Sequence, residues 1–244
     1  MSRKLALFPT LKVILKNSFK EVYQSMSFTG LLSFLWFLSN LPCFILSFFI
    51  LQFINRTLSG SFTVAEAFPL ILVTILMMTI WSSLVAGPIL TVLYGLSQKK
   101  REEYLNVKTF CDLIKKFYWR AVIAHGSVFL ILMLLTLNIC IAFLKNQLLF
   151  TVIAFLSLYT IGLLLLMAYY FVPLIYLENS FKKIWRKSMI LLFDNFGLTF
   201  FCGLTIFLFF ILSSVLFILL PLVFGAFLVY LFQNGFQPIY DRYD

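Results

Sequence analysis

The chain has 244 residues, of which 62% are hydrophobic and 11% are charged, and its net charge is +10. Soluble domains are about 45–50% apolar and about 25% charged, so this composition excludes an ordinary soluble domain and indicates an integral membrane protein. The cations fall between the apolar runs, which favours anionic membrane lipids over nucleic acid as the partner of this positive charge.

Long uncharged stretches predict where the chain crosses the bilayer, because a spanning helix needs about 20 apolar residues. Residues 28–95 hold the first pair of predicted transmembrane helices, and residues 121–177 hold the second. Residues 196–237 contain no charge and are too many for one crossing. Pro221 suits the first turn of a helix, so it predicts a turn between a fifth and a sixth helix. The alternative is one long kinked helix and five crossings.

Basic segments precede each predicted pair of helices, and a short tail follows the last. These segments and the tail are residues 1–27, 96–120, 178–195 and 238–244. With six crossings, all 19 lysines and arginines except Arg56 and Lys145 fall on one side of the membrane. The positive-inside rule makes that side the cytoplasm, so both termini are predicted to be cytoplasmic. The expected fold is all-α, a single polytopic bundle of about six transmembrane helices.

The three basic segments have the spacing of amphipathic cytoplasmic helices that lie at the membrane interface. In the first, apolar residues recur from Ile14 to Val22 while lysines repeat every fourth residue on another face. Ser180 is the expected N-cap of the third. Their cations are assigned to lipid headgroups or, alternatively, to a cytoplasmic partner. These cations are Lys12, Lys16, Lys20, Lys115, Lys116, Lys182, Lys183, Arg186 and Lys187.

Each amphipathic segment is followed by a helix out, a short turn and a helix back. This shared plan suggests three parallel hairpin repeats around an axis along the membrane normal. Residue identity between the units is faint, so the repeat is a hypothesis about architecture.

The sequence contains no motif that supports catalysis, and all nine acidic residues lie in predicted loops or at helix ends. His125, the only histidine, lies about one turn into the third helix without an acidic or cysteine neighbour in sequence. It is interpreted as a structural group rather than a catalyst. The four cysteines lack ligand spacing. The chain is therefore expected to be no enzyme and to hold no metal or cofactor.

Mild polar side chains are the remaining candidates for a binding site inside the membrane. They are Ser39, Asn40, Asn138 and Thr160. Hydrogen bonds between helices are the simpler role for such groups, and the lining of a substrate cavity is the alternative. In either case Asn40 and Asn138 are expected to face the interior of the bundle.

The stretch from Ala86 to Ala121, AGPILTVLYGLSQKKREEYLNVKTFCDLIKKFYWRA, combines a Gly-Pro pair late in the second helix with a charged linker and the run KKF. Asn40-Leu41-Pro42, Pro173-Leu174 and Asn195 support the same pattern. In these features the chain resembles the YesL family of bacterial integral membrane proteins, whose function is unknown. An Asn usually precedes the Phe that is here Phe117, whereas this chain has Lys116.

The resemblance implies a plasma membrane protein of a Gram-positive bacterium. Members of that family are often encoded beside carbohydrate ABC importers and sugar-responsive sensor kinases. The first hypothesis is therefore an accessory or regulatory subunit of oligosaccharide uptake, with permease or kinase subunits as partners. The alternative is a self-sufficient small-molecule transporter or lipid-handling protein, and a homo-oligomer is compatible with either.

Overall fold

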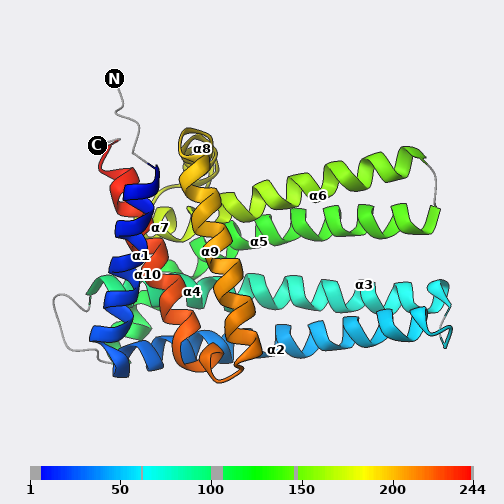
Figure 1. Cartoon of the computed structure of the whole chain (residues 1–244), viewed down its shortest axis with the longest axis horizontal. Coiled ribbons are helices and arrows are strands. Elements are labelled where there is room, and N and C mark those ends of the chain that lie inside the picture. Colours follow the sequence, from blue (N-terminus) through cyan, green and yellow to red (C-terminus); the bar gives the residue numbers. More distant parts are fainter. Residues whose placement is uncertain (1–6, 62, 100–106, 146–147, 243–244) are drawn as a thin grey trace.

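The computed structural model describes residues 7–61, 63–99, 107–145 and 148–242, and these are almost entirely helical, without a strand (Figure 1). The helices are α1 Leu7–Gln24, α2 Met26–Leu58, α3 Val64–Trp81, α4 Gly87–Lys99, α5 Val107–Lys145, α6 Leu148–Ala168, α7 Phe171–Tyr176, α8 Phe181–Asp194, α9 Phe196–Val215 and α10 Gly225–Tyr240. Two π-helical turns, η1 Ser82–Ala86 and η2 Leu220–Phe224, precede α4 and α10. The all-α prediction is confirmed.

Six helical segments of the described chain are long and apolar enough to cross a membrane. They are Met26–Thr57, Glu66–Lys99, Val107–Ala142, Leu148–Ala168, Phe196–Val215 and Leu220–Tyr240. The prediction of a turn near Pro221 is confirmed, because α9 ends at Val215 and Pro221 lies in the first turn of η2. The chain is therefore a multi-pass membrane protein by length and composition.

The amphipathic helices form where the sequence predicts them, and part of each apolar stripe is buried against protein, although Phe19, Val107 and Phe181 stay exposed. In α1 the buried residues are Ile14 and Ser18, and α8 buries Ile184 and Ser188 at the same spacing. Of the predicted basic segment 96–120, residues 100–106 lie outside the described residues, and residues 107–120 are the first part of the 39-residue helix α5, without a break. Ser180 does precede α8 in an extended conformation, although its side chain makes no capping hydrogen bond.

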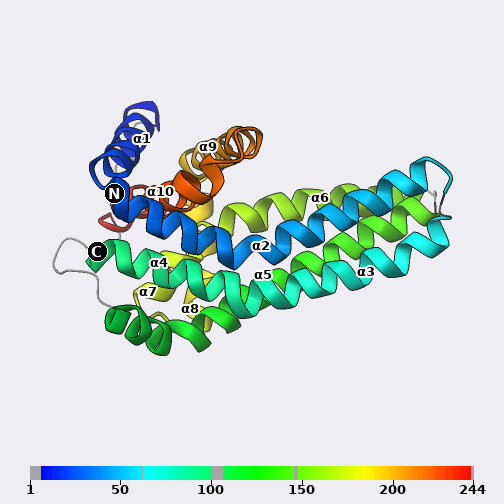
Figure 2. The same ribbon diagram turned by 90° about the horizontal axis from the view of Figure 1, so that it is seen from below.

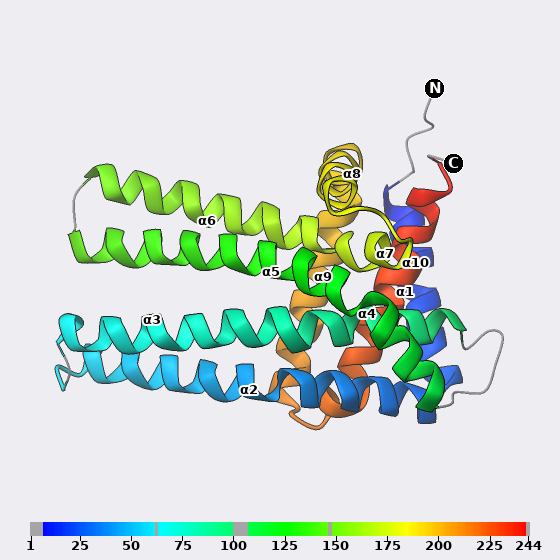
Figure 3. The same ribbon diagram turned by 180° about the vertical axis from the view of Figure 1, so that it is seen from behind.

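The four helices α2, α3, α5 and α6 form two long hairpins whose turns lie at the same end of the molecule (Figure 3). The third pair, α9 and α10, runs across them at the opposite end (Figures 1 and 2). Rotation about an axis along the first two hairpins would leave the third parallel to them, so its direction departs from the expected repeat. The outward side of α9 remains apolar, with Phe196, Phe200 and Phe207 exposed.

A repeat is nevertheless visible in how the pairs contact one another. Each returning helix contacts the outgoing helix of the next pair, and the last pair contacts the first. The three contacts are Gly87 with His125, Tyr170 with Thr199, and Ala226 with Ser33. In the last of these the backbone N–H of Ala226 donates to Ser33 Oγ over 2.9 Å. The inner parts of the returning helices, α4, α7 and α10, are the most buried segments and form the core.

Candidate functional site

The side chains of Ser39 and Asn40 hydrogen-bond within their own helix, α2, and neither lines the cleft described below. Ser39 Oγ donates to the carbonyl of Trp36 over 2.7 Å, and Asn40 Nδ2 donates to the same carbonyl over 2.9 Å. Trp81 Nε1 of α3 donates to the carbonyl of Ser39 over 2.7 Å. This last bond ties α3 to α2 through the backbone of Ser39, whereas the two polar side chains make no hydrogen bond to another helix that would fill the expected role.

The other two predicted polar residues point away from the bundle. Asn138 is exposed on α5, and Thr160 is exposed on α6 with its hydroxyl donating to the carbonyl of Leu156 over 2.8 Å. The expectation that Asn138 faces the interior is therefore wrong. Asn138 lies about 10 Å from the end of α5 at Lys145, close enough to the headgroup region for its amide to find polar partners there.

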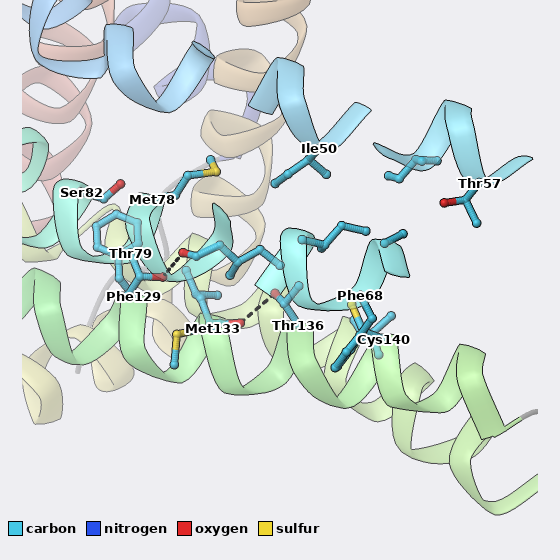
Figure 4. Close-up of a pocket in the computed structure, with 16 residues that line it drawn as sticks. Ile50, Thr57, Phe68, Met78, Thr79, Ser82, Phe129, Met133, Thr136 and Cys140 are labelled. Carbon is cyan, nitrogen blue, oxygen red and sulfur yellow. Dashed lines mark hydrogen bonds between the residues drawn. The ribbon is translucent and has the colours of Figure 1, made fainter. Parts of the chain in front are cut away.

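A cleft of about 850 Å³ opens between the two long hairpins (Figure 4). It is formed by the outer part of α2, most of α3 and the facing side of α5. Its lining residues are Ile50, Ile54, Thr57, Ala67, Phe68, Ile71, Ile75, Met78, Thr79, Ser82, Phe129, Leu132, Met133, Thr136, Ile139 and Cys140. None of the four polar residues predicted from the sequence is among them.

The few hydroxyl groups in this cleft already have hydrogen-bond partners within the protein. Thr57, Thr79 and Thr136 each donate to the carbonyl four residues earlier, over 2.8, 2.9 and 2.8 Å. Ser82 Oγ lies 3.4 Å from Cys43 Sγ. The described lining of the cleft is therefore an apolar wall without a charged side chain, which suits an apolar ligand and does not suit a sugar.

His125 lies beyond the inner end of the cleft, in contact with the helix that follows η1. It is buried, and its Nε2 is 3.5 Å from Thr91 Oγ1. A Cβ on Gly87 would lie 2.6 Å from the His125 ring, so the two helices meet at this point. Within the described chain no three His, Cys, Asp or Glu residues group to hold a metal ion. These contacts support the interpretation of His125 as a packing residue.

The cations predicted to meet lipid or a partner are exposed on α1, α8 and the first part of α5. Lys116 and Arg120 of α5 also pair with Glu178, which lies between α7 and α8. The distance from Arg120 Nη1 to Glu178 Oε2 is 3.6 Å. The hydrogen bond from Lys116, together with the charges of Lys116 and Arg120, lowers the pKa of the Glu178 carboxyl. Glu178 has a φ of 57°, which is unusual for a residue other than glycine.

We expect Glu178→Gly to melt at a higher temperature than Glu178→Gln. Both variants lose the ion pairs, but only glycine also relieves the left-handed backbone conformation. In the wild type the lowered pKa makes the pairs contribute above the ordinary carboxyl pKa and lose their contribution as the pH falls through the lowered value. Thermal unfolding in detergent across acidic pH tests both points. An unchanged pH dependence in Glu178→Gln would contradict the role of the pairs.

The fold and the cleft define a polytopic α-helical membrane protein with a lateral apolar cleft. Comparisons with protein-family models, with curated proteins and with solved structures found no match.

Proposed function

We propose that the protein is a non-enzymatic accessory or regulatory subunit of a bacterial plasma membrane complex, of the kind that its resemblance to the YesL family implies. The associated process is oligosaccharide uptake by an ABC importer. The observation that carries the proposal is the basic end of the molecule, where three amphipathic helices are anchored to the core by their buried stripes and present their cations outward.

The orientation of the basic end supports a cytoplasmic partner surface. Lys12, Lys16 and Lys20 lie on α1, and α1 contacts α10, whose Asn234 Nδ2 donates to Ser18 Oγ over 3.3 Å. The N-terminal and C-terminal helices are thus beside each other at the end away from the hairpin turns (Figure 1). The positive-inside rule places this end in the cytoplasm, where permease or sensor kinase subunits present their own cytoplasmic segments.

An accessory role also agrees with the character of the cleft. A sugar moving through the membrane needs polar partners for its hydroxyl groups, because an unpaired polar group costs several kcal/mol in an apolar medium. The hydroxyls of Thr57, Thr79 and Thr136 are committed to their own helices. In the proposed complex the permease supplies the sugar pathway, and this chain supplies contacts or regulation.

We expect reversal of the α8 cations to separate the protein from its partners. Lys182→Glu with Lys183→Glu replaces two exposed cations by anions, so an acidic partner surface would be repelled and its recovery should fall roughly tenfold. The measurement is a pulldown of the tagged protein from its native membrane in mild detergent, followed by mass spectrometry. The control is Arg56→Glu. Arg56 lies near the end of α2 at the hairpin turn, far from the basic end, so this change should leave recovery unchanged.

Recovery of the wild type alone, or only as a homo-oligomer, would contradict the accessory role. If the α8 variant and the Arg56 control recover equal amounts of permease or kinase subunits, the accessory role stands. The basic end is then not the surface that contacts these subunits. In that case attraction to anionic inner-leaflet lipid accounts for the cations.

A lipid-handling protein is the second candidate, and the apolar cleft favours it over a transporter of small polar molecules. The cleft opens between two hairpins and carries no charged lining residue. The purified protein can be placed in liposomes and tested for flux of sugars and of labelled lipids. Movement of lipids supports a lipid-handling protein, and movement of sugars supports a transporter of small polar molecules.

A further inference from the structure

The cleft runs along the hairpins through the apolar part of the molecule. Along α3 and into the first residue of η1 its lining extends from Ala67 to Ser82, which are 15 residues or about 22 Å apart along a helix. One leaflet of a bilayer has a hydrocarbon depth of about 15 Å, half of the total of about 30 Å. The cleft is therefore long enough to accept a hydrocarbon chain over the full depth of a leaflet, and its volume lies within the range of ligand-binding pockets.

The lining side chains indicate whether the cleft suits a flexible hydrocarbon chain or a tightly packed helix as its occupant. Membrane helices that dock closely use small residues spaced four apart, which let the two backbones approach. Here the facing positions on α3 are Phe68, Ile71, Ile75 and Met78, and α5 contributes Phe129, Leu132 and Met133. Smaller residues, such as Ala67 on α3 and Thr136 and Cys140 on α5, lie between them, and the described lining holds no glycine. A wall that mixes large and small side chains is irregular and matches a ligand that bends to fit it.

The polar groups of the cleft also favour a hydrocarbon chain as the ligand. Each threonine hydroxyl already donates its proton to its own backbone, so it can only accept a hydrogen bond from a ligand that enters. A methylene chain needs none. Arg56 directly precedes the lining residue Thr57 near the outer end of α2, and it is exposed at the end where the headgroup of a seated lipid would lie.

From these features we propose that the cleft between α3 and α5 binds an acyl chain of a bilayer phospholipid. The ligand enters sideways from the membrane, and its chain lies along α3 between the two hairpins. The site is independent of the basic end, so it stands whether or not the accessory role is correct.

The test uses the protein in vesicles of phosphatidylglycerol. A small fraction of the lipid molecules carries a photoreactive diazirine on one acyl chain. After illumination, mass spectrometry maps the labelled peptides. Labelling is expected to concentrate on the cleft faces of α3 and α5, and to persist after the protein is transferred to mild detergent, where loosely associated lipid is lost. The lipid-facing Phe200 and Phe207 of α9 provide the comparison within the same molecule.

Paired substitutions locate the site. Ile75→Phe places a ring in the cleft, whereas Leu76→Phe places it on the exposed side of the same turn. On α5, Thr136→Phe and Leu134→Phe form a second pair of the same design. The two cleft variants are expected to retain roughly tenfold less lipid in detergent, because the ring takes the space of the chain. The two outward variants are expected to retain as much as the wild type.

Equal lipid retention in the cleft and outward variants would overturn the proposal, as would cleft labelling no stronger than that of α9. A photoreactive side chain at Met133 provides a separate check in native membranes. Crosslinking to phospholipid supports the site, whereas crosslinking to a protein helix shows that a partner or a second copy occupies the cleft instead.

Discussion

Gly225→Ala is expected to destabilise the protein by about 3 kcal/mol, because an added methyl group at this position overpacks a contact made by backbone atoms. A Cβ on Gly225 would lie 2.6 Å from Trp36 Cβ and 2.9 Å from the Cα of Ser33. The backbone of α2 cannot move aside without breaking the hydrogen bond from Ala226 to Ser33 Oγ. Thermal unfolding in detergent measures the effect, and recovery of folded protein from membranes provides a second measure.

Gly30 and Gly162 supply matched controls for this substitution. Both lie inside helices, and a Cβ on either would meet no atom within 4 Å. Alanine at these sites is expected to raise stability by about 0.5–1 kcal/mol, because alanine loses less conformational freedom than glycine in a helix. Stability of Gly225→Ala equal to that of Gly162→Ala would show that α10 does not approach α2 as closely as described.

The second large effect is expected at the contact of Gly87 with His125. Gly87→Ala should cost about 2 kcal/mol, since its methyl group would meet the buried imidazole ring at 2.6–2.7 Å. His125→Ala alone should also destabilise, because it leaves a cavity between α4 and α5. The double variant should be more stable than the sum of the two losses predicts, by about 1–3 kcal/mol, because the new methyl group fills space that the ring has left.

Additive losses at Gly87 and His125 would show that the two residues do not share one space. They would contradict the interpretation of His125 as a packing residue. The measurement is a double-mutant cycle of thermal or denaturant unfolding in one detergent at one pH, at which all four proteins are compared.

The positions of the helices could be predicted because they depend on local sequence. Uncharged length and the three- to four-residue spacing of apolar residues are properties of a short window, and Pro221 marks its turn by its own chemistry. The amphipathic helices follow for the same reason. What their stripes contact could not be predicted, since Ile14 and Ile184 look alike whether they face lipid or protein.

The cleft could not be predicted because its walls come from three helices that are brought together only by the fold. Polar side chains were the natural candidates for a membrane site, but Ser39 and Asn40 bond to their own helix and Asn138 faces outward. The direction of α9 and α10 also depends on a distant contact, between Ala226 and Ser33. One signal was available locally: Thr63 and Glu66 have the spacing of the capping box that begins α3.

The crossing of the third pair gives the molecule two ends of unequal breadth. When the long hairpins stand across the bilayer, the turns at one end occupy a small area, while α1, α8, α9 and α10 spread over a larger area at the other (Figure 2). Because the outward face of α9 is apolar, that breadth displaces lipid in one leaflet more than in the other. An inclusion of this wedge shape couples to curvature in the way that inserted amphipathic helices do. We expect the distribution of the protein between flat and strongly curved membrane to depend on this shape as well as on its lipid and protein contacts.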